Sequence, residues 1–494
     1  MMITILTATN FKESISEVIQ TIDRLSELVT VVGSTNEINN TTKLLIVEDG
    51  VIVSTLDWYD TEPPYVFPKV TFSKENLLTL IFYKLGNQQK AFDFVSEENH
   101  LYHHLLVATH LQIGYEISEA MFTKTGSFHN QCVIQHYGNY KNPYSFEELN
   151  QLYQSAIDNS TDDEVKVFTA KHYSNFLLDN GAFKEAEQLI RKLQGNPISL
   201  EAKNVLDVQL ASALMAQLKL PYNQDTLEEI SELFHNGINF YEAQDQIVNA
   251  GLLYVDASEI ANFKGDYITS KDLINKAILI FKEADIPEFL GEAGLRKATL
   301  LYTWSKNGNP QYYKLAINAF QDTLKVFKRD IHPQKFAEVH HNLALIYSEI
   351  PVSSEEKPIW TAFCASSFKE VLKFYSKESY PYEFAMASHN YATALMSFPE
   401  AKLHNNLDKA FGMFEDALTV RTKDAYPFER ALTLVNQLEL YWIMHNENSE
   451  EESEKYKTML NKAYEISQLV TDNTLIEKAN EHIEALKNLK TILN

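Results

Sequence analysis

The chain has 494 residues, of which 45% are apolar and 22% are charged, a composition typical of a folded globular protein and not of a disordered one. Its 43 Lys and Arg residues against 67 Asp and Glu residues leave a net charge of −24, which argues against proteins that wrap nucleic acid or bind anionic lipid. The two cysteines, Cys132 and Cys364, lie far apart in sequence, and neither a signal peptide nor an apolar run of membrane-spanning length is evident, so we expect a cytoplasmic protein.

The first 70 residues predict a small α+β cap. Residues 2–8 and 43–56 are rich in Ile, Leu and Val and indicate strands, the second range folding back as a hairpin at the Glu48-Asp49-Gly50 turn. Residues 14–29 have the apolar spacing of a helix between these strands.

A linker and then divergent helical repeats are expected next. The linker is predicted from three prolines that interrupt the strand pattern, namely Pro63, Pro64 and Pro68. Residues 71–166 are predicted to form divergent helical repeats, because residues 99–160 have helical periodicity but no clean repeat consensus.

One histidine-rich segment, residues 97–110, is the strongest metal candidate in the sequence. Helical spacing would place Glu97, His100 and His104 on one stripe, with His103 and His110 nearby. A chain with 15 histidines produces such clusters without a metal. A solvated or groove-lining helix face is therefore the favoured interpretation, and we predict no metal site.

Catalytic motifs are missing from the sequence. It contains no Gly-rich phosphate loop, no Gly-x-Ser-x-Gly elbow, no His-Glu-x-x-His and no Cys-x-x-Cys. Cys132 lies near His129 and His136, as in a thiolate–imidazole pair, but sequence neighbours rarely supply the orienting third group that a nucleophile needs. A buried structural cysteine is favoured, and we predict a protein without enzymatic activity and without a cofactor.

Two segments in the middle of the chain share a turn signature. Each has a glycine, an aromatic residue two positions later and a small residue three positions after that: Gly181, Phe183 and Ala186, then Gly265, Tyr267 and Ser270. This pattern resembles the tetratricopeptide repeat, whose 34-residue helix–turn–helix consensus places glycine, an aromatic residue and alanine at this turn. The resemblance implies an all-α fold in which residues 167–494 form a tetratricopeptide-like helical-hairpin solenoid.

Enlarged repeats follow, and two sets of positions keep their period. Prolines recur at intervals of 46, 48 and 46 residues, each with a small residue four positions later: Pro287, Pro333, Pro381 and Pro427 with Gly291, Ala337, Ala385 and Ala431. Proline suits the first turn of a helix, and small residues allow two helices to approach closely. The second set keeps the same period in the partner helices, with an apolar residue three positions earlier: Ala277, Thr323, Val371, Ala417 and Ala463 after Ile274, Phe320, Phe368, Phe414 and Leu460.

These enlarged units resemble bacterial tetratricopeptide arrays that are associated with caspase-like peptidases. The acidic run at residues 446–454 is predicted to be a solvated loop between two of their helices. Residues 473–493 are amphipathic and have no later helix to pair with, which predicts the capping helix that a solenoid needs for solubility.

The resemblance also implies a binding surface, because the first helix of each tetratricopeptide hairpin lines a concave groove. We count positions in each of these helices from its small residue as position one. The candidate partner-binding residues are those at position six, together with the histidines that directly precede two of them: Arg296, His341, Asn342, His389, Asn390 and Asn436. Amides and a guanidinium suit recognition of an extended backbone or a carboxylate. An equally open alternative is that these amides form hydrogen bonds between adjacent helices.

The sequence thus predicts a scaffold or adaptor that binds a protein partner or peptide segment in its groove and binds neither nucleic acid nor a membrane. A multi-subunit complex is a further expectation. An alternative is a regulatory subunit that senses a ligand or peptide and controls a partner enzyme such as a protease. A metal-dependent activity at His100 and His104 is the least favoured hypothesis.

Overall fold

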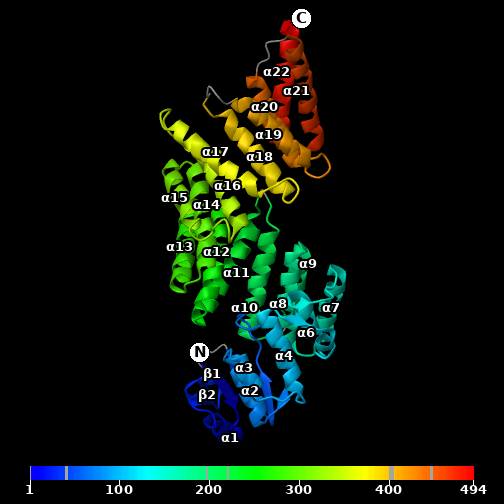
Figure 1. The fold of residues 1–494 in the computed structure, drawn as a ribbon, viewed down its shortest axis with the longest axis vertical. Helices are drawn as coiled ribbons and strands as arrows, with labels where there is room; N and C mark the ends of the chain where they lie inside the picture. The colour runs from blue at the N-terminus through cyan, green and yellow to red at the C-terminus, as the bar shows by residue number, and fades with distance from the viewer. Residues whose placement is uncertain are drawn as a thin grey trace. The chain divides into compact units, whose positions relative to one another are not determined.

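The computed structural model describes residues 2–38, 43–195, 198–219, 222–399, 405–444 and 449–493. The chain divides into a first unit, residues 1–280, and a second unit, residues 281–494, and each is described by itself (Figure 1). Helical hairpins follow one another in both units, and a small sheet precedes those of the first. The predicted fold class, a tetratricopeptide-like helical-hairpin solenoid with a small N-terminal α+β region, is therefore confirmed.

The N-terminal sheet has five strands in the order β2-β1-β3-β4-β5. β1 lies between β2 and β3 and runs parallel to both, whereas β4 is antiparallel to β3 and β5. Helix α1 (Thr9–Gln20) connects the parallel strands β1 and β2. The strands are β1 (Ile3–Thr7), β2 (Val29–Val32), β3 (Leu44–Glu48), β4 (Val51–Ser54) and β5 (Val70–Thr71).

The predicted hairpin at Glu48-Asp49-Gly50 is present, whereas the predicted helix is too long. Asp49 and Gly50 both have positive φ, 50° and 74°, as the two central residues of a type I′ turn require. The helix ends at Gln20, because Arg24 has a φ of 60° and the β-branched residues Val29–Val32 form the edge strand β2.

The first unit continues as helices α2 to α13, with a second, two-stranded parallel sheet of β6 (Glu116–Ile117) and β7 (Asn139–Tyr140). One apolar core joins the large sheet to α2, α4 and α6, while the division at residues 70 and 166 stays a prediction. The helices are α2 (Lys74–Lys84), α3 (Gln88–Phe92), α4 (His100–Ile113), α5 (Glu119–Thr123), α6 (Phe128–Tyr137), α7 (Phe146–Asn159), α8 (Asp163–Asp179), α9 (Phe183–Leu193), α10 (Leu200–Ala216), α11 (Gln224–Ala243), α12 (Ile247–Phe263) and α13 (Tyr267–Glu283).

The two signature glycines end helices as the sequence predicts. Gly181 after α8 and Gly265 after α12 have φ of 75° and 77°. The next amide in each case, that of Ala182 or Asp266, donates to a carbonyl five residues back, at 2.8 and 2.9 Å. This is the Schellman arrangement, which turns the chain from one helix of a hairpin into the next.

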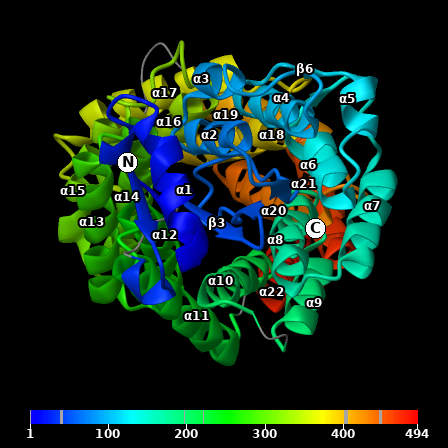
Figure 2. The same ribbon diagram turned by 90° about the horizontal axis from the view of Figure 1, so that it is seen from below.

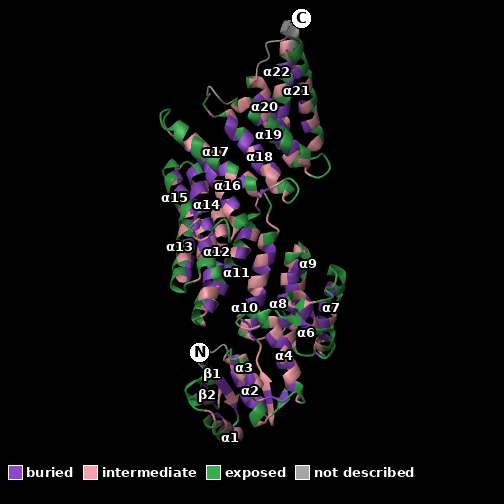
Figure 3. Ribbon diagram, in the orientation of Figure 1, coloured by how far each residue is buried: buried purple, intermediate pink, exposed green. Residues whose placement is uncertain are grey.

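The second unit is a run of hairpins in which each even-numbered helix packs on the odd-numbered helix that follows it and also contacts the next even-numbered helix. Figure 3 shows broad buried stripes along α14, α16 and α18, whereas much of α17 is exposed. The helices are α14 (Pro287–Lys306), α15 (Tyr313–Thr323), α16 (Pro333–Glu349), α17 (Lys357–Phe374), α18 (Pro381–Met396), α19 (Asn406–Val420), α20 (Pro427–Ile443), α21 (Ser449–Leu469) and α22 (Asn473–Leu493).

The repeated positions have the packing roles predicted for them. All four prolines lie at the start of an even-numbered helix, and the small residues after them are buried. At Gly291 a Cβ atom would lie 2.8 Å from Cζ of Phe327, so only glycine allows this close approach. Phe320, Phe368 and Phe414 are 0% exposed and fill the space between helices, while Leu460 is only half-buried.

The C-terminal predictions had mixed outcomes. Helix α22 packs on α20 and α21 and turns its apolar residues toward them, as a capping helix should. The predicted acidic loop is wrong in its second half, because Ser449–Glu454 form the first turns of α21, where carboxylates favour the positive end of the helix dipole. Residues 446–448 lie outside the described residues.

Candidate partner-binding surfaces

The six predicted groove residues all lie on the even-numbered helices of the second unit. Arg296 is exposed on α14, His341 and Asn342 lie on α16, His389 and Asn390 on α18, and Asn436 on α20. The three asparagines are half-buried and the two histidines are buried.

Two of the asparagines form a ladder with the histidines of the preceding hairpin. Nδ2 of Asn390 donates to Nε2 of His341 at 2.9 Å, which joins α18 to α16. Nδ2 of Asn436 donates to Nε2 of His389 at 3.3 Å and to Oγ1 of Thr393 at 3.0 Å, which joins α20 to α18. We call these contacts the His–Asn ladder. They give the amides the internal role that the sequence left as an alternative.

The ladder requires neutral histidines. Burial lowers the pKa of His341 to about 4, and burial together with the positive charge of Arg421 lowers the pKa of His389 to about 3. Because Nε2 of His389 accepts from Asn436, its proton is on Nδ1, which donates to Oγ1 of Thr433 at 3.2 Å. The same hydroxyl oxygen accepts from Nη1 of Arg421 at 2.8 Å, so a buried cation ends the chain of hydrogen bonds.

The side-chain oxygens of the asparagines remain as hydrogen-bond acceptors after the ladder is formed. Nδ2 of Asn342 donates to the Glu338 carbonyl of its own helix at 3.1 Å, so each of the three asparagines uses its nitrogen internally. Within the described part of the chain, no hydrogen bond to Oδ1 of Asn342, Asn390 or Asn436 is present. The face can thus offer a row of acceptors, and not the mixed donors and acceptors expected from the residue types alone.

The histidine-rich segment is engaged in internal contacts. His104 is buried, with Nδ1 2.7 Å from the Tyr65 hydroxyl, and Nε2 of His103 donates to the Met121 carbonyl at 3.0 Å. Glu97 precedes the first residue of α4 and so is not on the helical stripe. In the ranges that the structure describes, no group of three or more His, Cys, Asp or Glu side chains could hold a metal ion.

Both cysteines are free and buried. Burial raises the pKa of the Cys132 thiol far above its ordinary value and that of Cys364 to about 12. A thiol held in its protonated form is a poor nucleophile. Nδ1 of His136 lies 2.8 Å from the Tyr153 hydroxyl, and among the described residues no hydrogen bond joins this ring to Cys132.

The sequence did not predict a second site, where the helices of the first unit hold an extended segment of the same chain. Residues 55–69, which we call the strap, connect β4 to β5 and cross α4, α6 and α8. Figure 2 shows these helices following one another around β3. The predicted linker is thus a bound segment, because Tyr65 and Phe67 are only 6% and 7% exposed.

Side chains of α6 bind the strap mainly through its backbone. Asn130 forms two hydrogen bonds with Val66, accepting from its amide with Oδ1 and donating to its carbonyl with Nδ2, both at 2.9 Å. Nε2 of His129 donates to the Pro64 carbonyl at 2.8 Å. Backbone contacts of this kind do not depend on the side chains of the bound segment. An adjacent His-Asn pair on a helix of this chain can therefore bind the backbone of an extended polypeptide.

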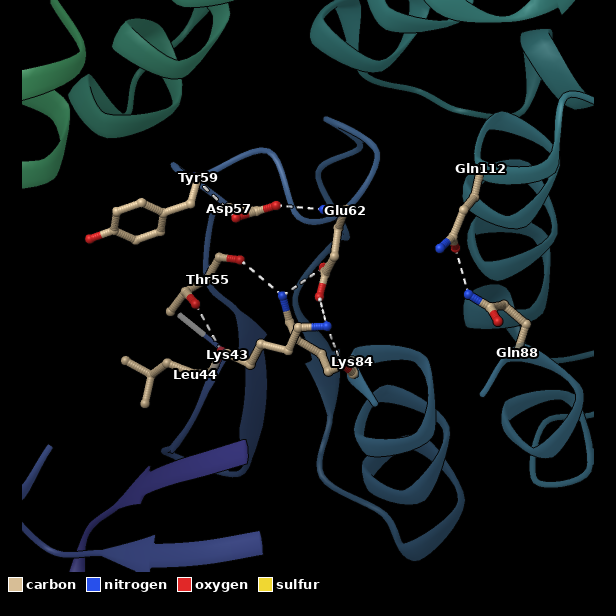
Figure 4. Close-up of polar contacts among 9 residues, drawn as sticks. All are labelled: Lys43, Leu44, Thr55, Asp57, Tyr59, Glu62, Lys84, Gln88 and Gln112. Carbon is tan, nitrogen blue, oxygen red and sulfur yellow. Dashed lines mark hydrogen bonds and ion pairs between the residues drawn. The ribbon is translucent and has the colours of Figure 1, made fainter. Parts of the chain in front are cut away.

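Two buried lysines fix the start of the strap. Lys43 before β3 and Lys84 at the end of α2 converge on the Glu62 carboxylate, with Nζ to oxygen distances of 3.4 and 3.0 Å (Figure 4). Lys84 also donates to the Thr55 carbonyl at 3.4 Å. In the same view Tyr59 points away from this cluster. One carboxylate between two ammonium groups compensates buried charge that would otherwise be costly.

Two open grooves also lie in the first unit. A groove of about 720 Å³ separates α7 from α9 over α8, and amide side chains line its rims. Another of about 670 Å³ between α11, α12 and α13 is lined by five carboxylates. Two of these five, Glu228 and Glu229, are paired with Lys264 and Arg191.

The strap had only a weak signal in the sequence. The dipeptide His-Asn occurs six times, at residues 129–130, 235–236, 341–342, 389–390, 404–405 and 445–446, so the pair at 129–130 does not stand out. Only the pairs at 341–342 and 389–390 fall on the repeat period that directed the prediction. The Pro-Pro-Tyr-Val-Phe-Pro run at 63–68 also favours an extended conformation, which suits a bound segment as well as a linker.

Comparisons with known proteins assign no family to the chain. No family model matches it, and no curated protein matches it. It is similar to a signal transduction ATPase with numerous domains that has a tetratricopeptide repeat sensor, from Pyrococcus horikoshii, at 15% identity and a TM-score of 0.48; the match covers 77% of this chain but only 56% of that one.

Two further solved structures are similar over most of the chain. The complex of Naa15 and Naa10 bound to HypK matches at 11% identity and a TM-score of 0.35, covering 83% of this chain and 64% of that one. The tetratricopeptide domain of P58(IPK) matches at 14% identity and a TM-score of 0.24, covering 85% and 98%. The fold assignment rests on the helical hairpins themselves and not on these scores.

No helix in the described ranges is both long and apolar enough to cross a membrane.

Proposed function

We propose that the protein is an interaction scaffold whose second unit binds an extended segment of a protein partner on the face of its even-numbered helices. The observation that carries this proposal is the row of three half-buried asparagines, Asn342, Asn390 and Asn436, whose nitrogens are used internally and whose oxygens are left as acceptors. Such a row suits the backbone N–H groups of a partner.

The spacing of the row fits an extended chain. Packed helices lie about 8–10 Å apart, and an extended chain advances about 3.3 Å per residue. A segment that crosses α16, α18 and α20 would therefore bring about every third backbone amide to an asparagine. Asn130 supports this chemistry, because the same kind of side chain already accepts the Val66 amide within the first unit.

The neighbours of the row indicate what the partner side chains should be. One helical turn from the asparagines, Met386 and Leu432 are half-buried on α18 and α20, and Glu439 is exposed on α20. The partner segment should thus carry apolar residues together with a basic one. Both cysteines are free, which fits a reducing compartment such as the cytoplasm.

A regulatory role is the second candidate, in which the second unit senses a peptide or ligand and controls a partner enzyme such as a protease. The ladder favours it, since His341–Asn390 and His389–Asn436 couple three successive hairpins. A ligand that moves one asparagine would change the hydrogen bond of the next hairpin. We assign no catalytic role to the chain itself.

The test is recovery of the native partner by a triple variant, N342A/N390A/N436A, compared with a triple variant on the odd-numbered helices, K314A/K369A/D416A, whose residues are all exposed. We expect the first variant to lose about tenfold or more in partner affinity and the second to bind as the wild type does. Unchanged binding by N342A/N390A/N436A would exclude the asparagine row as the binding surface. Release of the partner by an added peptide would favour the regulatory role.

A further inference from the structure

The tip of the strap, residues 57–61, is held differently from the rest of it. The Asp57 carboxylate accepts hydrogen bonds from the amides of Tyr59 and Glu62, at 3.1 and 2.6 Å, and so shapes a tight loop. On either side the strap is anchored, by Lys84 at Thr55 and by Lys43 and Lys84 at Glu62. The tip is therefore a short loop between two anchored points.

Three successive residues of this tip contact side chains of α8 and α11. The Trp58 ring packs edge-on against Phe168 of α8, with centroids 5.2 Å apart, and its carbonyl accepts from Nζ of Lys171 at 3.2 Å. The Tyr59 ring packs against Tyr241 of α11 at 6.3 Å. The Asp60 carboxylate accepts from Lys171 at 2.7 Å.

Burial at this contact is unequal. The Lys171 side chain is 5% exposed, whereas that of Asp60 is 61% exposed. A buried ammonium group requires an anionic or carbonyl partner at all times, because leaving it alone in a low-dielectric site is strongly unfavourable. The helices thus keep a permanent requirement for a carboxylate beside an aromatic surface. The carboxylate that meets it, Asp60, is exposed, whereas the neighbouring Trp58 is only 8% exposed.

The loop is also strained. Asp60 has a φ of 58°, in the left-handed region that residues other than glycine adopt at a cost. An incoming segment that supplies the same groups without this conformation has an energetic advantage over the resident loop.

We propose that the face formed by Phe168, Lys171 and Tyr241 is a second binding site, for a partner segment with two aromatic residues followed by a carboxylate, and that loop 57–61 is its built-in occupant. The site lies in the first unit and shares no residue with the asparagine row of the second. The loop makes binding conditional, because a partner must displace it before the site is free.

The test uses the full chain and a fluorescent peptide with the sequence of residues 55–63, TLDWYDTEP. The variant W58A/Y59A/D60A removes the resident side chains and keeps Asp57 and both anchors. We expect this variant to bind the peptide. We expect the wild type to bind the peptide at least about tenfold more weakly, because its own loop competes. Adding K171M to the triple variant should weaken binding about tenfold, as should a peptide with Ala for the Trp and Asn for the second Asp.

Circular dichroism and a urea midpoint report whether each variant is folded. A folded triple variant that does not bind the peptide would overturn the proposal, and so would a wild type that binds it equally well. If the triple variant does not fold, D60N replaces it, since asparagine adopts the left-handed conformation as aspartate does and the change removes only the negative charge. We then expect two results for the Asp60 variant: faster hydrogen exchange in residues 57–61 than in the wild type, and binding of the peptide. An unchanged exchange rate, or no binding, contradicts the proposal.

Discussion

The two units use the same pair of side chains in opposite ways. In the first unit, His129 and Asn130 bind the backbone of an extended segment of the same chain. In the second, His341 and His389 accept hydrogen bonds from the asparagines of the next hairpin. The pair thus joins a segment of the chain to a helix in the first unit and one hairpin to the next in the second, which is why we propose the asparagine row, and not Asn130, as a surface for a partner's backbone.

The largest expected effect is acid destabilisation of both units. Burial lowers the pKa of His129 and His341 to about 4 and that of His389 to about 3, below the ordinary value of about 6.5. The unfolded chain therefore binds protons first, and stability that is complete above pH 6.5 is lost as the pH falls toward 4. Each such histidine should cost about 3 kcal/mol by pH 4. Urea unfolding across this range checks the slope.

Replacement of one histidine in each unit separates the two contributions. H129Q and H389Q should each flatten the pH dependence of their own unit, because glutamine keeps a hydrogen-bonding group that does not titrate there. Hydrogen exchange read separately in the two units distinguishes them. A pH profile that neither change affects would mean that these histidines are already charged in the folded protein.

The next effect is the loss of the strap clamp. N130A removes both hydrogen bonds to Val66 and leaves a partly buried amide and carbonyl without their partner. We expect a loss of about 3 kcal/mol in the free energy of unfolding, since unsatisfied polar groups are more costly than the mean hydrogen bond. Urea unfolding measures it. A loss below about 1 kcal/mol would show that water replaces the clamp.

The smallest effect belongs to the ladder. N390A removes one hydrogen bond to His341 and should cost about 1 kcal/mol. N342A is the matched control, because Asn342 bonds only to a carbonyl of its own helix and its loss should fall within about 0.5 kcal/mol. Equal losses in the two variants would mean that the ladder does not join the hairpins.

The repeat itself could be predicted from the sequence because its determinants are local and periodic. Proline in the first turn marks where a helix begins, and glycine after the last turn marks where it ends. A small or aromatic residue at a fixed offset marks where two helices pack. Each of these signals acts within a few residues. The Asp49-Gly50 turn is local in the same sense. The edge strand β2 was missed because its first residue, Val29, continues the apolar spacing of the preceding helix and was assigned to it.

The strap could not be predicted, since its contacts are distant in sequence. Lys171 meets Trp58 across 113 residues, and Asn130 meets Val66 across 64. No pattern in the linker itself identifies these partners. The ladder lies between the two cases. Its asparagines and histidines were recognised from the repeat period, but their pairing was not. The pairing depends on how the even-numbered helix of one hairpin packs against that of the next, which the sequence pattern does not specify.

Site-specific photo-crosslinking tests the central claim most directly, because it reports contact without removing the ladder. A photoreactive phenylalanine analogue at Arg296 or Glu439 lies on the exposed side of even-numbered helices, and the same analogue at Lys314 or Lys369 lies on odd-numbered ones. The account predicts that the native partner is captured from the first two positions and not from the last two. Capture from Lys314 or Lys369 with none from Arg296 and Glu439 would contradict it.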